Sequence, residues 1–206
     1  MRISYKHNFV FLANPRCGSS SVRQSLNSYS DVRGGGRNSG AALTHHSSLR
    51  AVQDYLESQG RNLDDFKVLT TCRNPWDRAV SIYHYGLKNP DSNAWHKAAT
   101  EAGSFKAFCF GKALPHHFAP DARHRHGPYD VVSFGSDKSG KMRAEVFDLT
   151  DMAGLQARFG ELGAEVKIPH VNGTERGEYR QYYDDETREH IARLFAPDIT
   201  FMGYRY

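Results

Sequence analysis

The sequence has 206 residues and a mass of 23.3 kDa, enough for one domain with a full hydrophobic core. Hydrophobic residues make up 39% and charged residues 24%, with a mean hydropathy of −0.66. These values exclude a membrane protein and do not suggest a disordered chain. Lys and Arg number 27 against 23 Asp and Glu, so the formal net charge is +4, which is compatible with an anionic ligand.

The cysteines and the N-terminal segment bear on the cellular compartment. Cys17, Cys72 and Cys109 are far apart and odd in number, and no two have metal-site spacing. The apolar run 9–13 is too short for a signal-peptide core or a membrane span. We therefore expect a reduced, cytoplasmic protein with no disulfide framework and no membrane span.

The first part of the chain alternates between two periodicities. The short apolar run Asn8–Ala13 predicts a buried strand. Ser19–Tyr29 predicts a helix, with Val22 and Leu26 one turn apart. The glycine-rich stretch 31–42 follows no strand, so we interpret it as a mobile loop and not as a nucleotide fingerprint.

A second strand and helix follow. Ser47–Gln59 predicts a helix that stops at Gly60, and Phe66–Cys72 predicts another buried strand. Asn74 is a good N-cap for the next helix, and Pro75 suits its first position.

The last third is less regular. Val131–Phe134 and Ala144–Leu149 predict a pair of strands around a turn at 137–140. Asp185–Phe195 predicts the last helix, which Pro197 would end. Strand–loop–helix units of this kind predict an α/β fold: one domain, residues 1–206, with a central parallel sheet and helices on both faces.

The segment after the first strand carries the strongest chemistry. Arg16, Cys17, Gly18, Ser19, Ser20 and Ser21 lie between a buried strand and the start of a helix, whose unpaired N–H groups favour an anion. Gly18 would let the backbone approach a phosphate, the serines would add hydroxyl donors and Arg16 a full charge. The loop is not a Walker A loop, because it lacks GxxxxGK followed by Ser or Thr. The alternative is a serine-capped helix after an ordinary turn.

A second anion site is predicted after the second strand. Arg73 follows that strand, and Ser81 lies two turns into the next helix, so a guanidinium fork and a hydroxyl could hold one anion. Ligands of open α/β sheets bind at the carboxyl ends of strands, where both sites would fall. The alternative is that Arg73 and Arg78 only pair with carboxylates such as Asp77.

These two segments resemble the donor-binding signatures of sulfotransferases that use 3′-phosphoadenosine 5′-phosphosulfate (PAPS). Pro15–Ser21 matches the 5′-phosphosulfate loop, Pro-Lys-x-Gly-x-x-Ser/Thr, with Arg16 in place of the usual lysine. Arg73–Tyr83 matches the 3′-phosphate motif, Arg-x-Pro-x-x-Arg-x-x-Ser-x-Tyr, at every fixed position. The branch it resembles is the carbohydrate type, which includes heparan sulfate 2-O-sulfotransferase, the chondroitin/dermatan enzymes and small bacterial relatives.

The C-terminal part resembles the same branch, and one position departs from it. The matching tail residues are Pro169-His170-Val171-Asn172, Tyr179, Tyr182-Tyr183, the Asp185 helix and Phe201-Met202-Gly203-Tyr204. The acidic residue of the family's middle strand, usually Glu, is Asp148 here or is absent. Overall the resemblance implies a P-loop-like α/β fold.

The activity that the resemblance implies is sulfuryl transfer from PAPS to an acceptor hydroxyl or amine, without a metal. Arg16 and the loop N–H groups would stabilise the leaving phosphate, the three serines and Cys17 would line the 5′ end, and Arg73 with Ser81 would hold the 3′-phosphate. Such a transfer depends on positioning and electrostatic stabilisation. The product would be PAP, and the acceptor a small molecule or glycan, not a nucleic acid.

A hydroxyl acceptor also needs a base, and histidine is the natural residue at neutral pH. His45 and His46 precede the helix that starts near Ser47, where the resemblance places a catalytic histidine, and His46 aligns best. A helix N-terminus would keep the ring neutral and able to accept a proton. The alternative is that both are surface histidines at a helix start.

Other basic residues are less informative. The pattern of residues 115–128 predicts an irregular, histidine-rich loop. This loop could line an acceptor groove, although a solvated loop is the simpler interpretation. Its histidines and the basic residues considered as contacts for an acidic glycan are His116, His117, His124, His126, Arg123, Arg125, Lys138, Lys141 and Arg143.

Two other classes of function remain as alternatives. A P-loop kinase or NTPase needs a GK[ST] loop and an acidic residue after a second strand to hold Mg²⁺, but the second strand here ends before Arg73. A non-catalytic module that binds anions or nucleic acid would need a stronger basic stripe or a reader motif.

Overall fold

The computed structural model describes residues 1–36, 39–90, 94–118, 129–169 and 177–206. These residues divide into two compact units, which are described separately. Unit 1 comprises residues 1–72 and 131–172, and unit 2 comprises residues 73–130 and 173–206. The assignment of residues 1–206 to one sulfotransferase domain stays a prediction.

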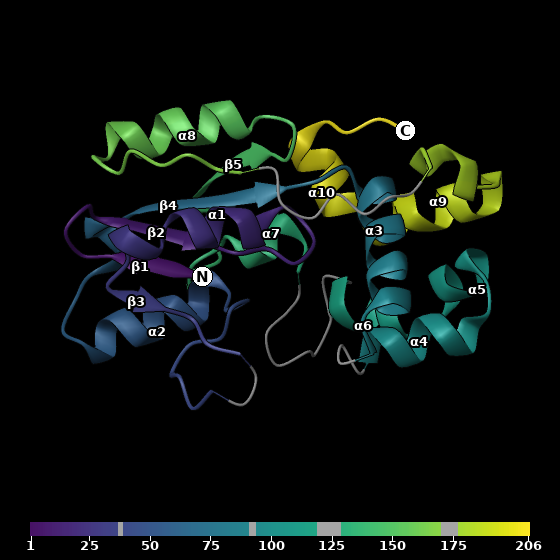
Figure 1. Cartoon of the computed structure of the whole chain (residues 1–206), viewed down its shortest axis with the longest axis horizontal. Coiled ribbons are helices and arrows are strands. Elements are labelled where there is room, and N and C mark those ends of the chain that lie inside the picture. The colour runs from purple at the N-terminus through teal and green to yellow at the C-terminus, as the bar shows by residue number, and fades with distance from the viewer. Residues whose placement is uncertain (37–38, 91–93, 119–128, 170–176) are drawn as a thin grey trace. The chain divides into compact units, whose positions relative to one another are not determined.

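Unit 1 is built on a five-stranded sheet of order β3-β1-β2-β4-β5 (Figure 1). The strands β2 (Phe9–Leu12), β4 (Lys67–Cys72) and β5 (Ala144–Asp148) are parallel. Two further strands, β1 (Arg2–Ser4) and β3 (Val32–Arg33), add an antiparallel edge. The predicted parallel sheet is therefore confirmed at its centre, while these two short strands were not predicted because two or three residues carry no periodic signal.

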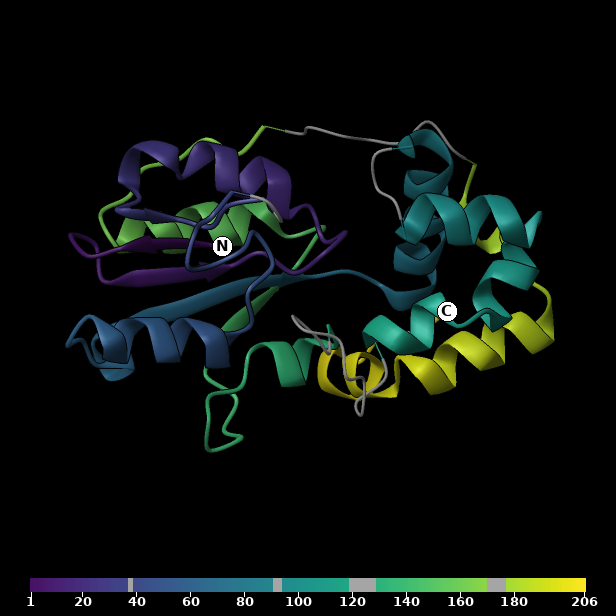
Figure 2. The same ribbon diagram turned by 90° about the horizontal axis from the view of Figure 1, so that it is seen from below.

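Helices cover both faces of this sheet, as predicted. In Figure 2, α1 (Ser19–Ser25) and α8 (Met152–Glu161) lie on one face and α2 (Leu49–Ser58) lies on the other. Alternation along β2 explains the arrangement, since Phe9 and Phe11 join the core cluster that contains α1 and α8 residues. The remaining short elements of unit 1 are the 3₁₀ turns Asn27–Tyr29 and Leu63–Asp65 and the helix α7 (Val131–Phe134).

Unit 2 consists of helices in the part that the structure describes. Its longest helix is α3 (Pro75–Lys88), which contacts α4 (Ala94–Ala102), α5 (Phe105–Phe110) and α9 (Asp185–Leu194). The others are α6 (Ala113–Phe118), α10 (Ala196–Met202) and the 3₁₀ turn Tyr179–Tyr182. The start of α3 is as predicted, because Asn74 accepts a hydrogen bond from the N–H of Trp76 at 3.1 Å and Pro75 takes the first position.

Four local predictions were wrong. The glycine-rich stretch 31–42, predicted as a loop that follows no strand, contains β3 at Val32–Arg33. Val131–Phe134 forms a helix instead of a strand, and its first turn is closed by the N–H of Gly135 on the carbonyl of Val131 at 3.0 Å. A run of four apolar residues cannot be told apart as strand or helix by periodicity. Pro197 does not terminate the chain's last helix, because α9 ends at Leu194 and Pro197 lies in the first turn of α10.

Part of the histidine-rich stretch is also helical. Residues 115–118 belong to α6, and residues 119–128 lie outside the described residues. The helices α4, α5 and α8 were not predicted either; α8 contains Gly154 and Gly160, which lower helix propensity, and its start depends on capping of the Gly154 N–H by Asp151.

Candidate anion and acid–base site

The loop between β2 and α1 has two residues in the left-handed region of backbone space. Arg16 has a φ of +61° and Gly18, the N-cap of α1, has a φ of +72°. Left-handed backbone costs a residue with a side chain about 1–2 kcal/mol, so the position of Arg16 is held against a local preference. Strain of this kind is concentrated at functional loops.

Gly18 also makes a close contact that the sequence did not reveal. A Cβ placed there would lie 2.4 Å from Cδ1 of Leu149, the residue that follows β5. From the sequence we expect this glycine to let a ligand approach the backbone. In the structure its missing side chain also leaves room for the side chain of Leu149.

The residues around Gly18 differ in exposure. Cys17 is fully buried, and its thiol is 3.5 Å from the carbonyl of Pro15. Ser19 and Ser21 are buried, whereas Ser20 is exposed. The first turn of α1 contains no acidic residue, so no carboxylate of that turn offsets the partial positive charge of its N–H groups.

His46 lies beside this loop. Its Nδ1 is 2.6 Å from the carbonyl of Ala13, which precedes the loop. A carbonyl accepts but cannot donate, so Nδ1 carries the proton and Nε2 carries the lone pair. Burial, opposed by this hydrogen bond and reinforced by the charge of Arg23, lowers the pKa of His46 to about 3. The ring is thus neutral at physiological pH, as the sequence analysis expected, although burial is the main cause and not a helix N-terminus.

His45 has a different environment. Its ring centroid lies 6.5 Å from that of His46, and burial followed by the charge of Arg23 lowers its pKa. A hydrogen bond to the backbone of Gly34 opposes this shift. His46 is therefore the histidine tied to the end of β2, while His45 is tied to the segment after β3.

Arg73 is the first residue of unit 2 and directly follows β4. Its Nε donates to Oδ2 of Asp77 at 2.6 Å, so the ion pair left open by the sequence is present. The pair holds the guanidinium against the first turn of α3 and uses one of its five N–H donors.

Arg78 and Ser81 lie further along α3. Arg78 is 0% exposed, and its NH1 is 3.7 Å from Oδ1 of Asp198, while its guanidinium carbon lies 4.6 Å from the centre of the Phe118 ring. Arg78 therefore has a structural role in unit 2. Ser81 is 1% exposed, and its pairing with Arg73 on one anion stays a prediction.

Several secondary candidates have structural partners. Asp148 accepts hydrogen bonds from the N–H (2.8 Å) and hydroxyl (2.6 Å) of Thr150, which stabilise the turn after β5. His117 is buried and its ring lies 4.4 Å from that of Trp95. Of the basic candidates, Lys138 pairs with Asp54 and Glu57, and Arg143 pairs with Asp64 and Asp137.

Some predicted candidates lie outside the described residues. These are Arg123, His124, Arg125, His126 and the tail residues His170, Val171 and Asn172. The described tail residues 177–206 belong to unit 2, where the hydroxyl of Tyr183 donates to the carbonyl of Trp76 at 2.8 Å.

Sequence reasoning missed Arg2 and Arg23. The NH2 of Arg23 approaches the hydroxyl of Ser20 at 3.4 Å, and Arg2 donates to the carbonyl of Arg23 at 3.1 Å. A basic residue one turn into the helix after a phosphate-type loop was the available signal for Arg23. Arg2 had none, because its strand was not predicted.

Comparisons with known proteins add a distant likeness. Neither a family model nor a curated protein matches this sequence. Among solved structures, the chain is similar to a sulfotransferase from Alicyclobacillus acidocaldarius, with 18% identity, a TM-score of 0.42, and coverage of 94% of this chain and 92% of that one. A likeness at this level does not by itself assign an activity.

None of the helices in the described residues is long and apolar enough to cross a membrane. The same residues contain no group of three or more His, Cys, Asp or Glu side chains that could hold a metal ion.

Proposed function

We propose that this protein is a sulfotransferase that moves a sulfuryl group from PAPS to an acceptor hydroxyl, most simply one on a carbohydrate or glycoside. The observation that carries the proposal is the 2.6 Å hydrogen bond between His46 Nδ1 and the carbonyl of Ala13. It ties a neutral imidazole to the same strand end that leads into the Arg16 loop. An anion loop and an uncharged base side by side are what transfer to a hydroxyl requires.

In this proposal the loop takes the 5′-phosphosulfate. The N–H groups at the start of α1, the exposed Ser20 and the Arg16 guanidinium supply the donors, and their charge suits a phosphate leaving group. Cys17, Ser19 and Ser21 shape the loop around them. The sequence motif assigns the 3′-phosphate to Arg73 and Ser81, and the pairing of Arg73 with Asp77 would fix the orientation of its fork.

The chemical step is an in-line displacement at sulfur. The acceptor oxygen forms a bond to sulfur while the bond from sulfur to the phosphate oxygen breaks, and PAP leaves with that electron pair. The acceptor proton goes to Nε2 of His46, because Nδ1 already carries a proton that is donated to Ala13. The resulting imidazolium is stabilised by the negative charge of the bound donor, which raises the pKa of His46 during the reaction.

Ligand-induced thermal stabilisation tests the proposal. A ligand present at 100 times its Kd stabilises a protein by about 2.7 kcal/mol, so PAP should raise the Tm clearly, and ATP with Mg²⁺ should not. His46→Ala should keep the PAP response and lose sulfuryl transfer from labelled PAPS across a panel of acceptor glycosides.

Two results would count against it. A wild-type protein stabilised by ATP with Mg²⁺ and not by PAP would favour the kinase alternative. Unchanged transfer by His46→Ala would remove His46 from the role of base.

A further inference from the structure

Two arginines and a histidine lie beside the Arg16 loop in unit 1, and the motifs account for neither arginine. They are Arg2, Arg23 and His45, here called the Arg2–Arg23–His45 cluster. Arg2 is only 7% exposed and pairs in register with Phe11, next to the carboxyl end of β2. Arg2 and the start of the loop that follows Leu12 therefore lie at the same edge of the sheet.

Hydrogen bonds fix the positions of these residues. Arg2 donates to the backbone carbonyl of Arg23 at 3.1 Å and to the side-chain oxygen of Asn27 at 2.7 Å. Arg23 reaches back along α1 to the hydroxyl of Ser20, at 3.4 Å. Side chains on helices lean toward the N-terminus, so this guanidinium lies over the first turn, where the loop meets the helix.

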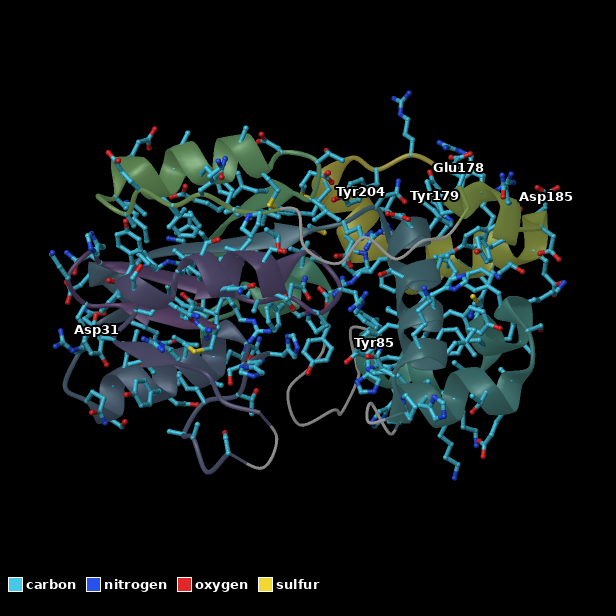
Figure 3. All side chains as sticks on the ribbon, viewed as in Figure 1. Asp31, Tyr85, Glu178, Tyr179, Asp185 and Tyr204 are labelled. Carbon is cyan, nitrogen blue, oxygen red and sulfur yellow. The ribbon has the colours of Figure 1, made fainter. Side chains whose placement is uncertain are left out.

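The cluster has no carboxylate to balance it in the parts of the chain that the structure describes. The partners of Arg2 are neutral oxygens, and no ion pair joins Arg2 or Arg23 to an acid in these ranges. Asp31 is the acid that follows the α1 segment, but its Oδ2 accepts the N–H of Tyr5 at 2.6 Å. Figure 3 shows Asp31 at the end of the sheet where β1 turns into β2, the opposite end of β1 from Arg2.

Two buried polar atoms of the cluster have no hydrogen-bond partner among the described residues. They are Nε of Arg23 and Nδ1 of His45. Burial lowers the pKa of Arg2 to about 10 and also lowers that of Arg23, and the charges of Arg23 and Arg33 contribute to the shift of Arg2. Desolvated cations that repel one another are costly unless an anion joins them.

We propose that the Arg2–Arg23–His45 cluster binds a tetrahedral oxyanion, a phosphate or sulfate group, next to the Arg16 loop. Arg23 supplies the fork to the anion, and Arg2 holds Arg23 in place through its backbone. Assigning this anion to the reaction rests on the proposed function; the binding itself rests on the geometry of the cluster. The oxyanion belongs either to the donor or to an acceptor that already carries an anionic group.

The test uses the full chain with inorganic sulfate as the probe, by isothermal titration calorimetry at constant ionic strength. A charge-assisted hydrogen bond is worth about 1.5–3 kcal/mol, so Arg23→Met should weaken sulfate binding by about tenfold or more. Arg23→Lys keeps the charge without the fork, so its affinity for sulfate should lie between those of the wild type and Arg23→Met. Arg61→Met is the matched control, because Arg61 is exposed and stacks on Tyr5. The affinity of this variant for sulfate should stay within about twofold of the wild-type value.

Stability without nucleotide gives a second readout. The hydrogen bond from Arg2 uses the backbone of Arg23, so Arg23→Met leaves it intact. Because the substitution removes one cation from a repelling group, Arg23→Met should unfold in chloride at the wild-type temperature or above it. Wild-type sulfate affinity in Arg23→Met, or a marked loss of stability in chloride, would overturn the proposal.

A titration of sulfate in the presence of saturating PAP separates the two sources. Displacement of sulfate by PAP would assign the cluster to the donor, and retained sulfate binding would assign it to an acidic acceptor; both support the site. A protein that binds sulfate but not PAP would keep the anion site and contradict the proposed function.

Discussion

Mild acid should destabilise the protein, because His46 then binds a proton in the unfolded state and not in the folded state. The pKa of the folded state is about 3 because the ring is buried, whereas an unfolded histidine has a pKa of about 6.5. Between these values the unfolded state binds the proton and the folded state does not, so the free energy of unfolding falls as the pH falls below about 6.5. At pH 5 the loss is about 2 kcal/mol relative to pH 7.5.

Urea denaturation at both pH values measures this loss. His46→Asn is the informative variant, since its amide can keep the donor to the carbonyl of Ala13 and cannot be protonated in this range. We expect the wild type to lose about 2 kcal/mol more than His46→Asn between pH 7.5 and pH 5.

The control is His96→Asn. Nδ1 of His96 contacts the carbonyl of Gly86 at 2.9 Å, so the same substitution is made at the same type of hydrogen bond in unit 2. We expect the pH dependence of the wild type to persist in it. Equal losses in wild type and His46→Asn would show that His46 is not the buried neutral ring on which the proposed mechanism depends.

Three further outcomes follow from the structure. Gly18→Ala should lower the free energy of unfolding by about 1–2 kcal/mol through its φ of +72° alone, and adding Leu149→Ala should not restore that part; an unchanged denaturation midpoint would contradict this. Arg73→Ala should weaken PAP binding by about tenfold or more in calorimetry, and wild-type affinity would exclude it from the 3′-phosphate site. Arg78→Met should lower the free energy of unfolding in urea by about 3–5 kcal/mol, because it leaves the Asp198 carboxylate buried without its cation. Adding Asp198→Asn should recover part of that free energy, and no recovery would refute the pairing.

Local signals in the sequence were sufficient where the physics is local. The apolar runs predicted β2 and β4, and the Asn74–Pro75 pair predicted the start of α3, because capping and a fixed φ act within a few residues. The loop between β2 and α1 was likewise predictable from residue types in a pattern, whereas the neutral state of His46 depends mainly on burial. The short run Val131–Phe134 was not, since its secondary structure depends on its neighbours.

The amino-acid sequence by itself determined much of the alternation of strands and helices and the residues of the loop between β2 and α1. Only the tertiary structure decided that the carbonyl of Ala13 accepts a hydrogen bond from Nδ1 of His46 and that Gly18 packs against Leu149. It also decided that Arg2 and Arg23 come together with no ion pair to an acid among the residues that the structure describes. The reason is that hydrogen bonding to a backbone carbonyl, burial and charge repulsion depend on groups tens of residues apart, whose distance is set by the packing of the sheet and not by any spacing along the chain.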